Sequence, residues 1–220
     1  MKIGQTYLLS SNELSLIAAA SGLNTLLMFD CPSQNDRGIQ MQSVFRLLTD
    51  GLLISKDNAI IPGPSLVPLL NAFKSASTAI VARLTSHEAA PVCIYYSGSG
   101  KTFLRIVPHT QKTDTYEVNM TELDDLLDDL EALHFLPALR DWQTDNFEQP
   151  DDSSAIFDKS GDSTLSIFEK TDLLTKARVS RASIVQSPSA WVLLSGLESN
   201  VERIVYSRDI FIKWLREGIL

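Results

Sequence analysis

Two runs of strand-forming residues flank a short Gly-Ser segment, and this arrangement constrains the fold more than any other feature of the chain. Residues 92–97 and 103–107 are rich in β-branched and aromatic side chains. The residues Ser97-Gly98-Ser99-Gly100 between them supply a turn, because glycine takes positive φ without a Cβ clash. Together they predict a β-hairpin over residues 91–107.

This hairpin is a candidate contact surface for another protein. Consecutive residues of a strand point to opposite faces of the sheet, so at least one of Tyr95 and Tyr96 faces away from the core that the other joins. Tyrosine is favoured at interfaces because its ring buries area while its hydroxyl keeps a hydrogen bond. We therefore predict Tyr95, Tyr96 and Phe103 as partner-binding residues. The alternative is that helices cover both faces of the sheet and both rings belong to the core.

The same hairpin contains the end of a phosphate-binding loop, Gly100-Lys101-Thr102. The complete motif needs a glycine five residues earlier, where this chain has Tyr95, and a helix after the threonine. Here residues 103–107 are typical of a strand instead. We predict that Gly100-Lys101-Thr102 belongs to a turn, and we expect no nucleotide or other cofactor.

Composition and charge exclude several classes of protein. Of the 220 residues 44% are hydrophobic and 21% are charged, which is typical of a globular protein. The net charge is −8, and residues 114–152 contain 13 acidic residues against Arg140 as the one basic residue. This balance argues against nucleic-acid binding.

The cysteines and the apolar runs predict where the protein resides. Cys31 and Cys93 lack the spacing of zinc ligands and are typical of a reduced compartment. Residues 14–29 are uncharged but too short and too interrupted to span a bilayer. We predict a cytoplasmic protein without a membrane partner, whose oligomeric state the sequence does not indicate.

Local signals predict the order of the helices. Ser10 and Glu13 form a capping box that starts the first one. The spacing of Met41, Val44, Phe45 and Leu48 predicts a second helix over residues 39–50. A short hairpin over residues 52–61 and a helix over residues 66–73 follow, then an acidic helix over residues 121–134 capped by Thr121 and a last helix over residues 207–217.

Strand patterns fill the remaining chain. They predict strands over residues 78–84, 115–120, 164–168, 177–185, 190–195 and 201–206. In both parts of the chain several antiparallel strands end in an amphipathic helix, so we predict an α+β fold of two similar halves, with antiparallel sheets packed against helices. The predicted organisation is an N-terminal half over residues 1–137, a linker over residues 138–154 and a C-terminal half over residues 155–220.

Two groups of oxygen-bearing side chains are candidate metal sites. Residues of one group have the spacing of a calcium-binding loop, although its glycine, Gly161, lies two positions too early: Asp158, Ser160, Asp162, Thr164, Ser166 and Glu169. The other group comprises the acids of the helix over residues 121–134, which a solvated helix face explains. We predict no metal site, with calcium at the first group as the open alternative.

We find no catalytic constellation in the sequence. His87, His109 and His134 are scattered, and no nucleophile motif of the G-x-S-x-G type occurs. The helix, hairpin and helix order of residues 39–73 is similar in outline to a winged helix. A DNA-reading helix should carry basic residues, however, and residues 39–50 offer only Arg46.

Three segments of the first half resemble a known family: Glu13-Leu14-Ser15-Leu16-Ile17, Phe45-Arg46-Leu47-Leu48-Thr49-Asp50-Gly51-Leu52 and Ile61-Pro62-Gly63-Pro64-Ser65-Leu66. Their order resembles the EspG-type chaperones of type VII secretion. The resemblance implies a cytosolic, non-enzymatic protein of duplicated α+β build that shields apolar surface on a secreted client. It carries over no site residue. We predict a protein-binding adaptor or chaperone, with a winged-helix-like regulator and an enzyme of unrecognised class as alternatives. An adaptor or chaperone should expose a large apolar patch.

Overall fold

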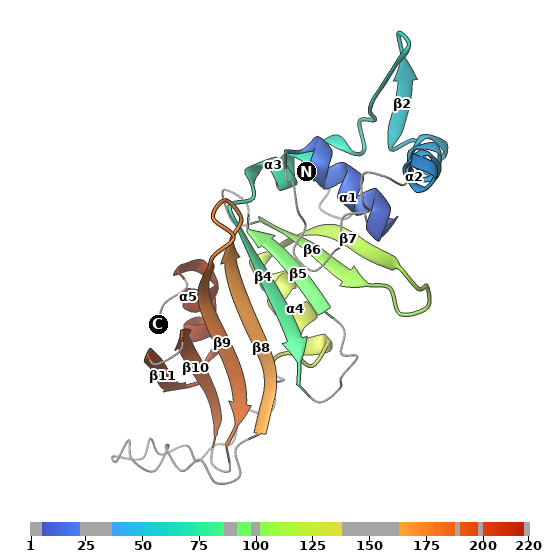
Figure 1. Cartoon of the computed structure of the whole chain (residues 1–220). Helices are drawn as coiled ribbons and strands as arrows, with labels where there is room; N and C mark the ends of the chain where they lie inside the picture. Colours follow the sequence, from blue (N-terminus) through green and yellow to red (C-terminus); the bar gives the residue numbers. More distant parts are fainter. Residues whose placement is uncertain are drawn as a thin grey trace. The chain divides into compact units, whose positions relative to one another are not determined.

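The computed structural model describes residues 6–22, 37–85, 92–97, 102–137, 163–187, 190–197 and 200–217 (Figure 1). The chain forms two compact units. The first comprises Met1–Ala79 and Cys93–Leu123, and the second comprises Ile80–Val92 and Asp124–Leu220. Both contain antiparallel strands and helices, so the predicted α+β class is confirmed.

Four strands of the first unit follow the order β1-β7-β6-β5. They are β1 (Tyr7–Ser10), β5 (Val92–Ser97), β6 (Thr102–Pro108) and β7 (Thr115–Glu122). The predicted hairpin is confirmed, because β5 pairs antiparallel with β6 and Ile94 lies opposite Ile106. Thr102 begins β6, so a strand and not a helix follows the sequence that resembles a phosphate-binding loop.

Helix α1 (Ser11–Ala20) begins at the predicted capping box. The Ser10 amide donates to Glu13 Oε2 at 2.7 Å, and the Glu13 amide donates to Ser10 Oγ at 3.3 Å. Glu13 is buried, and its Oε1 lies 3.4 Å from Nε of Arg46 on α2 (Arg37–Thr49). One carboxylate therefore caps α1 and also links it to α2.

A Schellman motif ends α2 and directs the chain into a small hairpin. The Leu52 amide donates to the Leu47 carbonyl at 2.9 Å and the Gly51 amide to the Leu48 carbonyl at 3.1 Å. Gly51 has a φ of 70°, as the motif requires. Strands β2 (Leu53–Lys56) and β3 (Ala59–Pro62) follow, joined by a turn with positive φ at both Asp57 and Asn58. Positive φ at both central residues is typical of a type I′ turn. The predicted short hairpin is therefore confirmed. Helix α3 (Val67–Ser75) follows it.

Gly63 fixes the base of this hairpin, and replacing it with alanine should destabilise the protein. Its amide donates to the Leu52 carbonyl at 2.8 Å, and an added Cβ would lie 2.5 Å from the Gly51 carbonyl oxygen. Because the Gly51 carbonyl oxygen belongs to the backbone, the main chain around Gly51 or Gly63 would have to shift to make room for the methyl group. We expect Gly63→Ala to cost about 1–3 kcal/mol of unfolding free energy, measured by chemical denaturation. A value within about 0.5 kcal/mol of wild type, as for an ordinary surface site, would contradict this close approach.

The second unit has the strand order β4-β8-β9-β10-β11. The strands are β4 (Thr78–Leu84), β8 (Ser163–Asp172), β9 (Arg178–Gln186), β10 (Trp191–Leu197) and β11 (Asn200–Val205), and β8 to β11 form an antiparallel meander. Helices α4 (Leu123–Ala132) and α5 (Arg208–Glu217) belong to this unit. Its core is an aromatic cluster of Phe135, Phe168, Phe211 and Trp214.

The acidic helix is amphipathic as predicted, but it starts later. Leu126, Leu127 and Leu130 are buried, while acids such as Asp128 are exposed. The prediction of Thr121 as its cap is wrong, because β7 continues through this residue, which pairs with Phe103. Arg208 at the start of α5 lies 2.9 Å from Asp128 Oδ1 and links the two helices.

Lys170 joins the meander to the last helix. This side chain is buried, and its Nζ donates to the carbonyls of Leu215 and Arg216 at 3.1 and 3.0 Å. These carbonyls lie in the last turn of α5, where the negative end of the helix dipole favours a cation. Burial nevertheless lowers the pKa of the Lys170 ammonium.

The two units group the chain differently from the predicted halves, because α4 and most of β4 belong with the strands after residue 162. A meander that leads into a helix does occur twice, as β5 to β7 before α4 and as β8 to β11 before α5. That the halves are a duplication stays a prediction. Among the described residues, no helix is long and apolar enough to cross a membrane.

Candidate functional site

Two of the three predicted partner-binding residues lie in the core of the first unit. Tyr95 is 1% exposed and Phe103 is 4% exposed. The side chain of Tyr96 lies outside the described part of the structure. Partner binding by Tyr95, Tyr96 and Phe103 stays a prediction, and for Tyr95 and Phe103 it requires that a buried ring leave its core.

Among the described residues of the first unit, the two most exposed large apolar side chains lie on α2. Met41 is 73% exposed and Phe45 is 72% exposed, whereas Ser43 and Leu47 are buried. The helix thus turns a serine and a leucine inward and its larger apolar residues outward. Spacing predicted the helix correctly, but it did not indicate that this face is open.

Local contacts fix the orientation of α2. Arg46 is held by the buried Glu13, and it also lies 3.8 Å from Asp50. Leu47 and Leu52 are both buried where the Schellman motif brings the two ends of the turn together. These contacts place the stripe containing Met41 and Phe45 on the opposite side of the helix.

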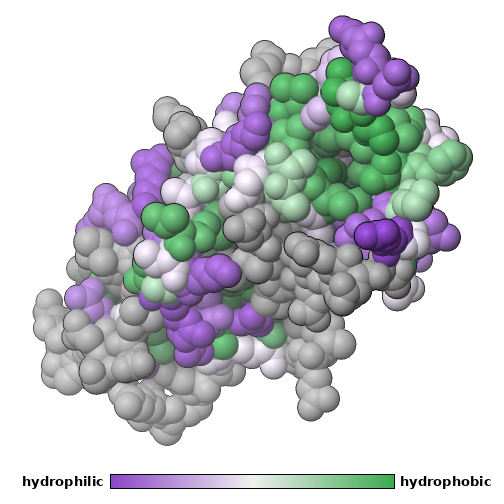
Figure 2. Space-filling model, turned by 45° about the horizontal axis from the view of Figure 1, so that its top comes forward, coloured by the Kyte–Doolittle hydropathy of each residue, from purple (hydrophilic) through white to green (hydrophobic). Residues whose placement is uncertain are grey.

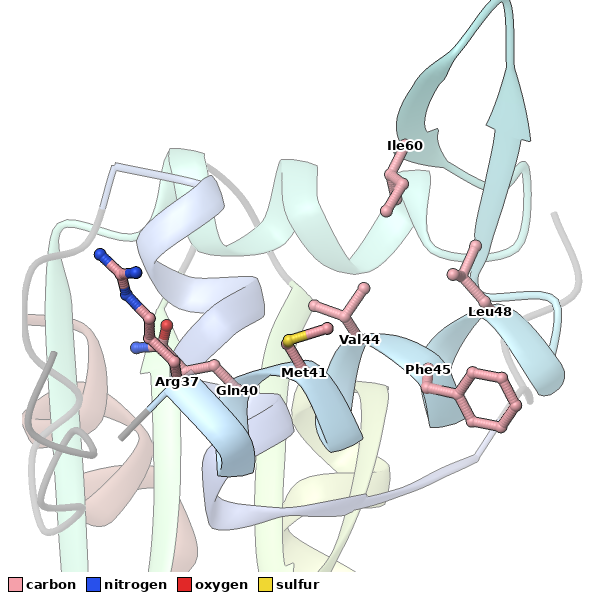
Figure 3. Close-up of a pocket in the computed structure, with 7 residues that line it drawn as sticks. All are labelled: Arg37, Gln40, Met41, Val44, Phe45, Leu48 and Ile60. Carbon is pink, nitrogen blue, oxygen red and sulfur yellow. The ribbon is translucent and has the colours of Figure 1, made fainter. Parts of the chain in front are cut away.

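The exposed stripe borders a cavity of about 580 Å³. Seven side chains line it, six from α2 and one from β3 (Figure 3): Arg37, Gln40, Met41, Val44, Phe45, Leu48 and Ile60. Ile60 is 54% exposed and points from the hairpin toward α2, so that the hairpin forms one wall. In the space-filling view, apolar side chains surround a hollow over this part of the molecule (Figure 2). We call these seven residues the α2 groove.

The α2 groove is apolar with a cationic end. Arg37 stands in the first turn of α2, and it forms no ion pair with another described residue. The helix itself contains Arg37 and Arg46 and no acidic residue. The two polar lining residues, Arg37 and Gln40, lie together at one end, and the other five lining residues are apolar. Such a surface suits binding of an apolar face rather than acid–base chemistry.

The candidate calcium ligands that the structure describes are part of β8. Ser166 is buried and donates to the Phe135 carbonyl at 2.6 Å. Glu169 forms ion pairs with Arg83 at 2.7 Å and Arg178 at 2.8 Å. Thr164 is also in this strand, while Asp158, Ser160 and Asp162 lie outside the described residues. Within the described ranges, no group of three or more His, Cys, Asp or Glu side chains is placed to hold a metal.

Neither of the two histidines that the structure describes, His109 and His134, forms a hydrogen bond with a serine or cysteine side chain in the described part of the chain. His109 Nε2 lies 4.0 Å from Glu117 Oε1, and His134 takes a positive φ of 62° two residues after the end of α4. His87 lies outside the described residues. The candidate site residues that could not be predicted from the sequence are those of the α2 groove. Their apolar spacing indicated a helix, but it did not indicate that this face of the helix is exposed.

Sequence comparison finds no relative, because no family model and no curated protein matches the chain. The fold has a solved counterpart. It is similar to that of the Mycobacterium tuberculosis type VII secretion system chaperone EspG5, solved in complex with the PE25-PPE41 dimer. The TM-score is 0.51 at 10% identity, and the match covers 94% of this chain and 92% of that chain. At this identity the likeness shows a shared fold.

Proposed function

We propose that this chain is a protein-binding adaptor or chaperone that has no catalytic activity and acts on a secreted client in the cytoplasm. The observation that carries the proposal is the exposed apolar face of α2. Large apolar side chains gathered in one hollow on a surface are costly to leave in water, and such patches mark interaction sites.

The likeness of fold supports the same function. The solved counterpart is a chaperone in complex with a protein dimer. A fold alone does not determine function, since one fold hosts many activities. The apolar surface of this chain is an independent observation, and the two together favour protein binding.

The α2 groove fits the alternatives less well. A winged-helix regulator would present cations to DNA phosphates. The outward face of α2 instead presents Met41 and Phe45, and Arg46 is already paired with Glu13. An enzyme would need titratable groups that converge in a cleft, and the groove is lined mainly by aliphatic and aromatic side chains.

Purification from the native host followed by reconstitution tests the proposal. We expect a protein that co-purifies with this chain, becomes less soluble without it and forms a stoichiometric complex when both are mixed in purified form. Calorimetry would report the stoichiometry. Two results would overturn the proposal: no protein forms a complex from purified components, or the chain binds duplex DNA with an affinity that falls steeply with salt.

A further inference from the structure

We propose that the α2 groove receives an amphipathic α-helix of the partner protein, whose apolar stripe is flanked by acidic side chains. This inference rests on the proposed function and adds the chemistry of the segment that docks. The occupant follows from the shape of the groove and from its charge.

The shape of the groove is suited to binding an α-helix. Residues Arg37, Met41, Val44, Phe45 and Leu48 follow the spacing i, i+4, i+7, i+8 and i+11 along α2. This spacing forms one stripe about 16 Å long, because an α-helix rises 1.5 Å per residue. A partner helix with apolar residues at the same period packs its ridge along such a stripe.

The hairpin makes the stripe a groove. Ile60 extends from β3 toward α2 and supplies an apolar wall on one side (Figure 3). In a hairpin of two short strands, most side chains of β2 and β3 are exposed. Such a hairpin is marginally stable by itself, so a helix that contacts Ile60 would also stabilise the hairpin.

Charge selects an acidic partner over a second copy of this chain. Arg37 is the one charged residue among the seven that line the groove, and α2 has no acidic side chain, whereas Arg46 is already paired with Glu13. Two copies packed through α2 would leave Arg37 of each copy without a carboxylate from the facing helix, because α2 has none. The acidic helix of a second copy, α4, does not fit either, because its leucines Leu126, Leu127 and Leu130 are buried. A different protein with carboxylates beside its apolar stripe would pair with Arg37 and also cover the apolar surface.

Two synthetic peptides of equal length test this inference on the full chain. Both carry leucine at heptad positions a and d; one carries glutamate at the flanking positions and the other carries lysine. We expect saturable binding of the glutamate peptide by fluorescence anisotropy. The lysine peptide should bind at least about tenfold more weakly, the effect of roughly one lost charge contact, and added salt should reduce the difference.

Three variants locate the binding. Phe45→Glu places a charge in the centre of the groove and should abolish binding of the glutamate peptide. Arg37→Glu should shift the preference toward the lysine peptide. Leu174→Glu is the matched control, because Leu174 is 92% exposed and lies in the second unit, and it should leave binding unchanged. Thermal midpoints close to wild type would verify that the variants fold, as expected for exposed positions.

Three results would overturn the inference: equal binding of both peptides, binding that Phe45→Glu does not reduce, or a homodimer in sedimentation that Phe45→Glu dissociates. The last result would identify a second copy as the occupant. The proposed function fails separately, when no client complex forms at all. If the client complex forms and Phe45→Glu leaves its affinity unchanged, the function stands and the helix-docking inference fails.

Discussion

Replacing Trp214 with alanine is expected to lower the free energy of unfolding by about 3–5 kcal/mol, the range for large aromatic side chains in a core. Trp214 is fully buried on α5. Its ring stacks on Phe211 with a centroid distance of 5.7 Å and meets Phe168 at 6.2 Å. Its Nε1 donates to Ser180 Oγ at 2.7 Å. Trp214→Ala therefore leaves a cavity between α5 and the strands that it packs against. It also leaves Ser180 Oγ without the donor of its hydrogen bond.

Chemical denaturation followed by circular dichroism measures this loss without relying on tryptophan fluorescence. Ser180→Ala is one control, and it should cost about 1–3 kcal/mol because the buried Trp214 Nε1–H loses its acceptor while the ring stays in place. Leu174→Ala is the other, with an expected change within about 0.5 kcal/mol at an exposed site. A loss below about 1 kcal/mol for Trp214→Ala would contradict the central position of this ring in the second unit.

Replacing Tyr95 with alanine should cost about the same, 3–5 kcal/mol, because this ring lies in the core of the first unit at 1% exposure. Phe45→Ala forms the matched comparison. It removes an aromatic ring that is 72% exposed, so unfolding free energy should stay within about 0.5 kcal/mol of wild type while client binding weakens. Denaturation measures the first quantity and calorimetry with the purified client the second.

The opposite result is equally informative. If Tyr95→Ala keeps its stability and loses the client, Tyr95 is an interface residue as the sequence predicted, and its burial is not that of a core side chain. If Phe45→Ala is strongly destabilised, the outward face of α2 contacts other parts of the chain. In that case the exposed patch would not support a binding surface.

Local signals were sufficient to predict most helices and strands. The capping box of Ser10 and Glu13, the proline in the first turn of α3 and the glycine after α2 each act within a few residues of the chain. The start of α4 differs because it depends on a distant strand. The ladder between β6 and β7 continues to Thr102 and Glu122, which keeps Thr121 in a strand although its side chain suits a cap.

The binding surface could not be predicted in the same way. Leu126, Leu127 and Leu130 on α4 recur at the three- and four-residue steps of one helix face, and so do Met41, Val44 and Phe45 on α2. The first set is buried, and Met41 and Phe45 of the second are open. Periodicity indicates that a helix has an apolar face, whereas the contact that covers it is a property of the tertiary structure. The alternation of Tyr95 and Tyr96 is ambiguous for the same reason.

The path of the chain through the two units has a consequence for synthesis on the ribosome. The segment Ile80–Val92 belongs to the second unit but is made before the first unit receives Cys93–Leu123. Strand β4 lies next to β8 in the sheet, but the first residue of β8, Ser163, is synthesised much later. In the folded chain the Thr85 amide, just after β4, donates to the Leu165 carbonyl of β8 at 3.1 Å. At about 5–20 residues per second this delay in synthesis lasts several seconds. During that interval the apolar residues of β4, Ile80 and Val81 among them, are without their partner strand β8, and a nascent chain halted before Ser163 would expose them to other chains.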